Sequence, residues 1–230
     1  NENYTVGAGW FAYQVYNNLI IQNVRFYNNN SGLNTGGAFY NRESNPTFLN
    51  CMFYGNSGGQ GGAVFNANSF PMFINTVFSG NKGTIGSAIA TFDGTSNLKN
   101  CIIWNNHFTN NSFNKTIYDV NSITTIRNSI FHSIGVAAPT DFSHASNKID
   151  VDPQFYFSPS GTLAPNAIGD FHVLPYSPAI DMGDNAANSY PQDMDGNDRI
   201  INGTIDIGAY EYAEDPVDCN LYTGITSLYV

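Results

Sequence analysis

Asn50–Asn66 has the sequence NCMFYGNSGGQGGAVFN, and most of the chain consists of variations on this stretch. Its second half, GGAVFN, returns with changes as GGAFYN at 36–41 and as GSAIAT at 86–91. A repeat of about 25 residues is too short to bury a core of its own. Such repeats are typical of solenoids, in which each coil buries its apolar side chains against its neighbours.

The first half of the stretch places an asparagine at the start of each copy. Copies of NCMFYGN begin at Asn23, Asn50, Asn75, Asn100 and Asn128. In one common register, a residue that closes each Gly-Ala segment lies nine positions before these asparagines; the closing residues are Gln14, Asn41, Asn66, Thr91 and Asp119. We therefore expect about five regular rungs of 25–28 residues over residues 9–133.

Large apolar residues flank each of these asparagines. The position two before it holds Ile21, Phe48, Phe73, Leu98 or Ile126, and the position three after it holds Phe26, Phe53, Phe78, Ile103 or Phe131. Both columns are expected to point inward, which requires a corner at the asparagine, because a straight strand would put them on opposite faces. Stacked asparagines at a corner can bond amide to amide along the solenoid axis. A second file of the same kind is expected at Asn29, Asn56, Asn81 and Asn106.

These patterns predict an all-β fold, a right-handed parallel β-helix. Helical periodicity is absent, and apolar runs of four to six residues lie between turn-forming residues. A Greek-key sandwich fits this repeat less well, and the leucine spacing of leucine-rich repeats is missing. Rung lengths differ mainly at 30–35 and 107–113, where we expect protruding loops.

The repeat ends near Ser133. We expect one domain over 1–212, in which 134–212 forms irregular C-terminal rungs and a cap, and a linker or tail at 213–230. Within the irregular part, residues 134–148 read as a loop, and strands are expected in the stretches 149–157, 170–181 and 203–212. The chain opens on NENYTVGAGWFAY, which already reads as part of a rung, so upstream domains of the same chain are expected.

Charge and cysteine spacing restrict the partners and the chemistry. Eight basic against eighteen acidic residues give a formal net charge of −10, which disfavours nucleic acid and acidic membrane surfaces. No run of 18 apolar residues is present, so no direct membrane insertion is expected. Cys51 and Cys101 share a column two rungs apart, roughly 9–10 Å, which exceeds the reach of a disulfide. They are expected to be small buried residues, while Cys219 lies in the predicted tail.

The paired motifs GGA-[FV] and F-x-x-N (FYNN, FYGN, FSGN) resemble the repeats of chlamydial polymorphic outer-membrane proteins. The downstream block resembles a C-terminal module of secreted β-helix repeat proteins that are common in Bacteroidetes. The elements that carry this second resemblance are Asp152-Pro153 with Phe155, Asp170–Val173, Ser177–Gly183, Asp193–Arg199 and Ile205–Glu211. The resemblance spans roughly residues 20–212. It implies a secreted or cell-surface protein, often an adhesin or a surface-tethered repeat domain.

The sequence therefore favours a non-catalytic extracellular bacterial surface module, an adhesin or a spacer within a larger secreted protein, with a cell-surface glycan or protein as its partner. The alternative is a polysaccharide-degrading enzyme, a lyase or a glycosidase. A glycosidase needs two facing carboxyl groups, but the regular rungs carry few acids (Glu43, Asp93, Asp119). Lys99 and Arg127 share a column on consecutive rungs, which is the best indication of a lyase, although solvated surface charge explains the pair more simply.

Four residues form a candidate cation site. Asp193, Asp195, Asn197 and Asp198 resemble a Ca²⁺ loop, because hard cations take several carboxylate and amide oxygens from a tight turn. The other interpretation is a turn whose Asp and Asn side chains cap backbone donors, with Arg199 pairing one carboxylate. Apart from this Ca²⁺, no cofactor is expected.

Tyr27, Tyr54 and Trp104 are the candidate ligand-binding residues. They belong to an apolar and aromatic stripe on the outer side of the strands that follow each corner asparagine. Such a stripe rarely stays bare on a soluble protein. Either a loop or the segment 150–210 covers it, or it forms a platform on which sugar rings stack.

Overall fold

The computed structural model describes residues 9–15, 19–109, 115–132, 141 and 143–213. These residues form β-strands and two single 3-10 turns, η2 (Gly161–Leu163) and η3 (Asn185–Ala187), with no α-helix among them. No helix in these ranges is long and apolar enough to cross a membrane. Parts of the predicted loops at 107–113 and 134–148, and all of the predicted tail except Ala213, fall outside the described residues.

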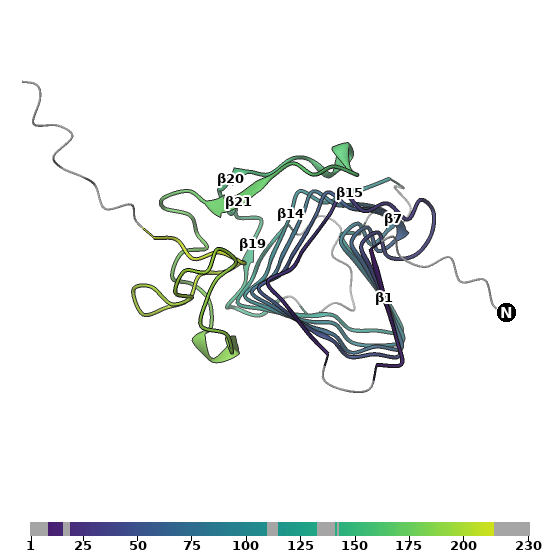
Figure 1. The fold of residues 1–230 in the computed structure, drawn as a ribbon, viewed down its shortest axis with the longest axis horizontal. Coiled ribbons are helices and arrows are strands. Elements are labelled where there is room, and N and C mark those ends of the chain that lie inside the picture. The colour runs from purple at the N-terminus through teal and green to yellow at the C-terminus, as the bar shows by residue number, and fades with distance from the viewer. Residues whose placement is uncertain (1–8, 16–18, 110–114, 133–140, 142, 214–230) are drawn as a thin grey trace, which may run out of the picture.

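The chain coils through four parallel sheets, and successive coils place their corresponding strands side by side in the same sheet (Figure 1). Sheet A contains β1 (Trp10–Tyr13), β4 (Phe39–Arg42), β8 (Val64–Ala67), β12 (Ile89–Phe92) and β16 (Ile117–Val120). Sheet B contains β2 (Ile20–Gln22), β5 (Thr47–Leu49), β9 (Met72–Ile74), β13 (Asn97–Lys99) and β17 (Thr125–Arg127).

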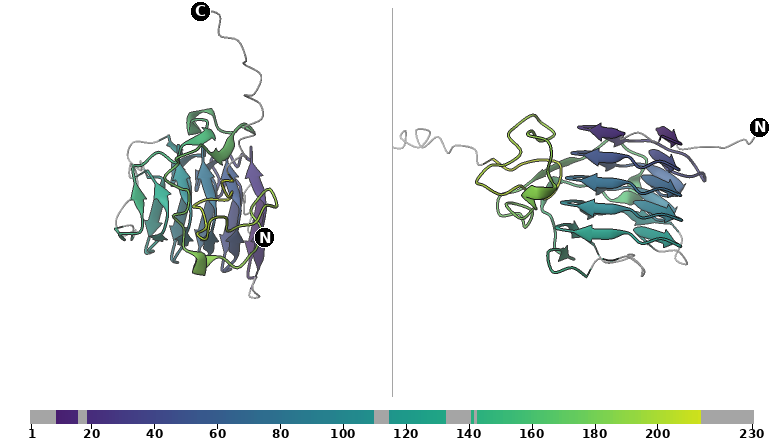
Figure 2. Two further views of the ribbon diagram at one scale, coloured as in Figure 1. Left: turned by 90° about the vertical axis from the view of Figure 1, so that its left-hand side faces the viewer. Right: turned by 90° about the horizontal axis from the view of Figure 1, so that it is seen from below.

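The other two sheets lie on the remaining sides of the coil. Sheet C contains β3 (Arg25–Tyr27), β6 (Met52–Tyr54), β10 (Val77–Ser79), β14 (Ile102–Trp104), β18 (Ile130–Phe131) and β19 (Lys148–Ile149). Sheet D is shorter and contains β7 (Ser57–Gln60), β11 (Lys82–Ile85) and β15 (His107–Phe108). Viewed from the N-terminal end, the coil turns clockwise as it recedes, so the predicted right-handed parallel β-helix of about five turns is confirmed (Figures 1 and 2).

Like residues lie over like residues in the second to fifth rungs. Phe48 pairs with Phe73, and Phe53 pairs with Phe78. The first rung departs from the predicted register, because Ala12, and not Gln14, pairs with Asn41. The connection from β1 to β2 (residues 14–19) is two residues longer than the connection from β4 to β5 (residues 43–46), which shifts the alignment.

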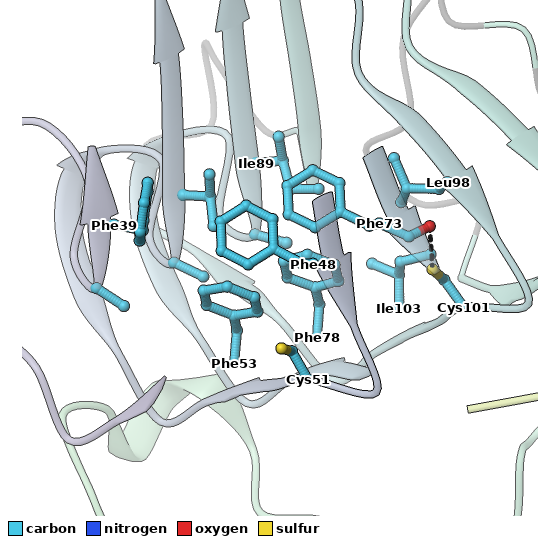
Figure 3. Packing of buried hydrophobic residues seen from close by; sticks show 14 of the residues in the cluster. Phe39, Phe48, Cys51, Phe53, Phe73, Phe78, Ile89, Leu98, Cys101 and Ile103 are labelled. Carbon is cyan, nitrogen blue, oxygen red and sulfur yellow. Dashed lines mark hydrogen bonds between the residues drawn. The ribbon is translucent and has the colours of Figure 1, made fainter. Parts of the chain in front are cut away.

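The interior contains stacked side chains from the two predicted columns, together with inward side chains of sheet A such as Phe39 and Ile89 (Figure 3). The rings of Phe48 and Phe73 lie parallel at 4.8 Å, and those of Phe53 and Phe78 at 5.0 Å. Phe48 and Phe53 meet edge to face across the interior, at 5.4 Å. Both arrangements suit the quadrupole of aromatic rings, so stacking adds to the gain from burial.

Cys51 and Cys101 are buried free thiols, as the sequence predicts. Burial raises the pKa of each thiol to about 12. A buried thiol that stays protonated is a poor nucleophile, so both residues serve packing.

The corner asparagines adopt the left-handed conformation. All five have φ values of 48–54°, a region that asparagine tolerates better than other non-glycine residues. The predicted amide ladder joins the three middle members: Asn100 Nδ2 donates to Asn75 Oδ1 (3.0 Å), and Asn75 Nδ2 donates to Asn50 Oδ1 (3.1 Å). The second file is continuous from Asn29 through Asn56 and Asn81 to Asn106, with amide–amide bonds of 2.9–3.0 Å.

A sixth coil begins and then stops. Asp141 bridges to Thr125 of sheet B, and β19 pairs with β18 of sheet C. Beyond it the chain turns back as a cover segment, residues 150–213, which lies along the outer side of sheet C instead of over the end of the solenoid (Figures 1 and 2). Its strands, β20 (Phe155–Phe157) and β21 (Asp170–Val173), form an antiparallel ribbon.

The strand predicted at 203–212 is absent, although most of this stretch is buried. Carboxylates satisfy several of its backbone donors in place of a neighbouring strand. The N–H of Asp206 bonds Glu211 Oε2 (3.1 Å), that of Glu211 bonds Asp193 Oδ2 (3.1 Å), and that of Tyr212 bonds Asp206 Oδ2 (2.7 Å). The alternating apolar pattern alone does not show that carboxylates, and not a neighbouring strand, satisfy these backbone donors.

Candidate functional site

The cover segment buries the outer stripe of sheet C. Met52, Val77, Ile102 and Ile130 pack there against side chains of the cover segment, namely Phe155, Phe171, Ala179, Ile207, Ala209 and Tyr210. The predicted interpretation that the segment 150–210 covers the stripe is therefore confirmed. A second apolar cluster outside the solenoid core explains why the stripe is tolerated on the surface of the coil.

The three candidate ligand-binding residues have different environments. Tyr54 is 8% exposed, with the ring of Phe171 at 5.0 Å. Tyr27 stacks on Tyr54 at 5.1 Å and remains 45% exposed. Trp104 is half-buried against His132, two rungs from Tyr54. Tyr27 and Tyr54 are thus brought together, Trp104 is separate, and only Tyr27 presents a largely open ring.

The corner ladder forms the edge on which the cover segment docks. Asn50 Nδ2 donates to the carbonyl of Gln192 (2.7 Å), Asn75 Nδ2 to Asn188 Oδ1 (3.1 Å), and Asn100 Nδ2 to the carbonyl of Asp184 (3.1 Å). Asn75 and Asn100 therefore donate one N–H to the ladder and the other to the cover segment, and Asn50 at the end of the ladder also donates to the cover segment. The ladder was predicted as an internal stacking device, and this second use could not be read from the repeat.

The candidate cation residues form a capped turn. Asp193 Oδ1 accepts from the backbone N–H groups of Asp195 and Asn197, both at 2.9 Å. Asp193 Oδ2 accepts from the N–H of Glu211 at 3.1 Å. Asp195 points to His172, while Asp198 is exposed. Among the described residues, no group of three His, Cys, Asp or Glu side chains is arranged to hold a metal ion.

Arg199 is buried and holds the end of the cover segment together. Its Nη1 bonds Glu211 Oε2 at 3.0 Å, and its Nη2 bonds the carbonyls of Asp206 and Gly208. The side chains of Arg199 and Glu211 are each 1% exposed. The predicted pairing of Arg199 with a carboxylate holds, but that carboxylate comes from outside the turn. Breaking such a buried pair leaves an uncompensated charge, which makes it strongly destabilising to remove one partner.

A charged cluster joins the cover segment to the first rung. The ring of His172 bonds Asp170 Oδ1 through Nδ1 (2.5 Å) and Asp195 Oδ2 through Nε2 (2.7 Å), and it stacks on Tyr210 at 3.9 Å. Arg25 of β3 reaches Asp195 Oδ1 at 3.3 Å. Burial alone would lower the pKa of His172, but its bonds to the two carboxylates outweigh this and raise it. The cluster therefore favours an imidazolium between two carboxylates.

A groove of about 530 Å³ runs beside this cluster. Its walls include Arg25, Tyr27 and Tyr54 from the solenoid, and Gly169, His172 and Tyr210 from the cover segment. Pattern reasoning found Tyr27 and Tyr54 but missed the cluster, because its members come from distant parts of the sequence.

Sequence reasoning also missed an aromatic file on the outer side of sheet A. Phe11, Tyr40, Phe65, Phe92 and Tyr118 follow one another along the rungs, with centroid distances of 5.0–6.3 Å. The alternation within FYNR, VFNA, IATF and IYDV was the available signal, since every second residue of a strand shares a face.

Comparison with known proteins finds no matching family, no similar curated protein and no similar solved structure. The resemblance to secreted bacterial β-helix repeat proteins therefore stays a prediction.

Proposed function

We propose that this chain is a non-catalytic module of a larger secreted or cell-surface bacterial protein, in which it serves as an adhesin or a rigid spacer. The observation that carries this proposal is the structural use of three buried carboxylates in the cover segment. Asp193 caps backbone donors, Asp206 does the same, and Glu211 pairs with Arg199. Carboxylates that are used in this way to hold the irregular backbone of the cover segment together are not free for proton transfer.

The charged residues of the regular rungs support the same proposal. Arg127, half of the pair that indicated a lyase, bonds Asp141 Oδ2 at 2.5 Å. Asp119 bonds the hydroxyl of Thr124 at 2.8 Å. The stacked interior and the two files of bonded asparagines make a stiff body, as a spacer requires. The likeness of the C-terminal block to surface proteins agrees with an exported location.

The cluster of Asp170, His172 and Asp195 favours a second candidate, a polysaccharide-degrading enzyme. Two carboxylates and a histidine converge beside a groove, which is where acid–base groups would be placed. Both ring nitrogens of His172 are occupied by carboxylates, however, and this favours a structural clasp over a proton shuttle.

A cleavage assay separates the two candidates. The purified chain is incubated with neutral and uronate-containing polysaccharides, and reducing ends and unsaturated products are measured. If the chain is a non-catalytic module, neither the unaltered chain nor the Asp195→Asn variant releases product above the buffer control. Release of product that Asp170→Asn or Asp195→Asn abolishes would establish the enzyme instead.

A further inference from the structure

A second hollow lies on the cover segment and shares no lining residue with the groove beside His172. It is a cleft of about 640 Å³, here named the tyrosine cleft. Tyr156, Tyr176 and Tyr212 line it together with Asp181 and Asn202. Tyr176 is 95% exposed and Tyr156 is 72% exposed. Large rings that gain so little from burial contribute little to the stability of the fold.

Tyr176 also occupies a backbone position that disfavours it. The carbonyl of Leu174 accepts from the N–H of Ser177 (3.1 Å), which closes a tight turn with Pro175 and Tyr176 at its centre. Tyr176 has a φ of 69°, where such a turn normally carries glycine or asparagine. A bulky residue held in this region is strained, and strain of this kind concentrates at ligand sites. Folding gives no reason for an aromatic ring here.

The walls of the cleft are fixed by buried groups. Asp206 is 1% exposed; its Oδ1 accepts from the N–H of Asp181 and its Oδ2 from the N–H of Tyr212, both at 2.7 Å. The turn that carries Tyr176 is anchored by Ser177, whose hydroxyl donates to the carbonyl of Pro153 at 2.6 Å. Because these bonds hold the backbone of the cleft in place, less entropy is lost on binding than for a flexible loop.

We propose that the tyrosine cleft binds a neutral oligosaccharide. A sugar ring packs its apolar face on Tyr176, with Tyr156 and Tyr212 beside it, and its hydroxyls donate to Asp181 and Asn202. The described part of the chain gives the carboxylate of Asp181 no hydrogen-bond or ion-pair partner, so both oxygens can accept. This inference rests on the proposed adhesion role and names its ligand class.

Charge and size argue against other occupants. Among the described residues that line the cleft, Asp181 alone is charged, so a uronate or a phosphorylated ligand would meet a like charge with no cation from these residues to offset it. A cleft of this volume suits one or a few rings, whereas a stable protein partner needs an interface of roughly 800 Å² on each side.

The test measures binding of neutral hexose oligosaccharides and of oligogalacturonate by calorimetry and by chemical-shift changes in the folded chain. Tyr176→Asn is the decisive variant, because asparagine suits the turn while it removes the ring. It is expected to leave the melting temperature unchanged or higher and to weaken binding at least tenfold. Tyr176→Phe is expected to retain binding, and Phe70→Ala, which removes an exposed ring that lines neither the cleft nor the groove, is the matched control.

Three outcomes would overturn the inference: no neutral oligosaccharide binds at millimolar concentration, oligogalacturonate binds better, or Tyr176→Asn binds as well as the unaltered chain. The cleavage assay described above tests the non-catalytic role separately. If the chain neither cleaves nor binds these oligosaccharides, the proposal of a non-catalytic module stands and the proposal of a neutral oligosaccharide ligand falls.

Discussion

Asn100 and Asp184, 84 residues apart in the sequence, bond each other in both directions: Asn100 Nδ2 donates to the carbonyl of Asp184 at 3.1 Å, and the N–H of Asp184 donates to Asn100 Oδ1 at 2.8 Å. Asn100 also belongs to the corner ladder through Asn75. One amide side chain thus links the stacking of the rungs to the docking of the cover segment. The stability of the two parts should be coupled.

Replacing a middle member of the ladder should be costly. Asn75→Ala removes bonds to Asn50 and Asn188 and puts alanine in the left-handed region, so we expect a loss of about 2–4 kcal/mol in the free energy of unfolding. Asn23→Ala is the matched control, because Asn23 shares the φ but is exposed, and about 1 kcal/mol is expected. Equal losses in urea denaturation would show that the ladder adds nothing.

The covered stripe predicts a contrast between two stacked tyrosines. Tyr54→Ala should cost about 3–4 kcal/mol, because its ring is buried under Phe171. Tyr27→Ala should cost about 1 kcal/mol or less, because Tyr27 is 45% exposed. The double variant Tyr54→Ala/Trp104→Ala should lose stability rather than glycan binding. If it kept its stability and lost glycan binding, the stripe would be a platform after all.

The clasp around His172 predicts a pH dependence. The pKa of His172 is raised in the folded chain, so its contribution to stability is complete below about pH 6.5, the value for an unfolded histidine, and is lost as pH rises through the folded-state pKa. We expect the difference in melting temperature between the unaltered chain and His172→Gln to be larger at pH 5.5 than at pH 9. His144→Gln, on an exposed ring, is the control. A difference that grows towards alkaline pH contradicts the clasp.

The capped turn predicts indifference to chelators. Excess EDTA should leave the melting temperature unchanged. Asp193→Ala should lower the free energy of unfolding by about 2–4 kcal/mol, since it leaves three backbone N–H groups without their acceptor. Asp198→Ala, on an exposed side chain of the same turn, should stay within about 0.5 kcal/mol. A fall of several degrees with EDTA would favour the Ca²⁺ loop.

The regular rungs could be predicted from the sequence because their contacts repeat. A column such as Phe53 and Phe78 recurs at the spacing of one coil, so the register, the corners and the inward faces follow from it. The register of the first rung was predicted wrongly, because two extra residues between β1 and β2 shift the alignment without changing the motif.

The cover segment could be predicted only in part. The apolar stripe required a cover, and 150–210 was the available candidate, but the contacts themselves do not repeat. His172 meets Asp195 and Arg199 meets Glu211 through irregular backbone, whose path no periodicity encodes. Carboxylates that bond backbone donors replace a strand at 203–212, and Tyr176 stands where the turn calls for glycine.

Nuclear Overhauser contacts of the Ile102 δ1 methyl group test both the stacking of the coils and the docking of the cover segment in a single measurement. Ile102 is paired with Val77 and Ile130 in sheet C, and its Cδ1 lies against Gly208 of the cover segment. In the folded chain we expect contacts from this one methyl to Val77, Ile130 and Gly208. Contacts to Val77 and Ile130 without a contact to Gly208 would show that the cover segment does not pack on sheet C. The absence of all three contacts would contradict the solenoid itself.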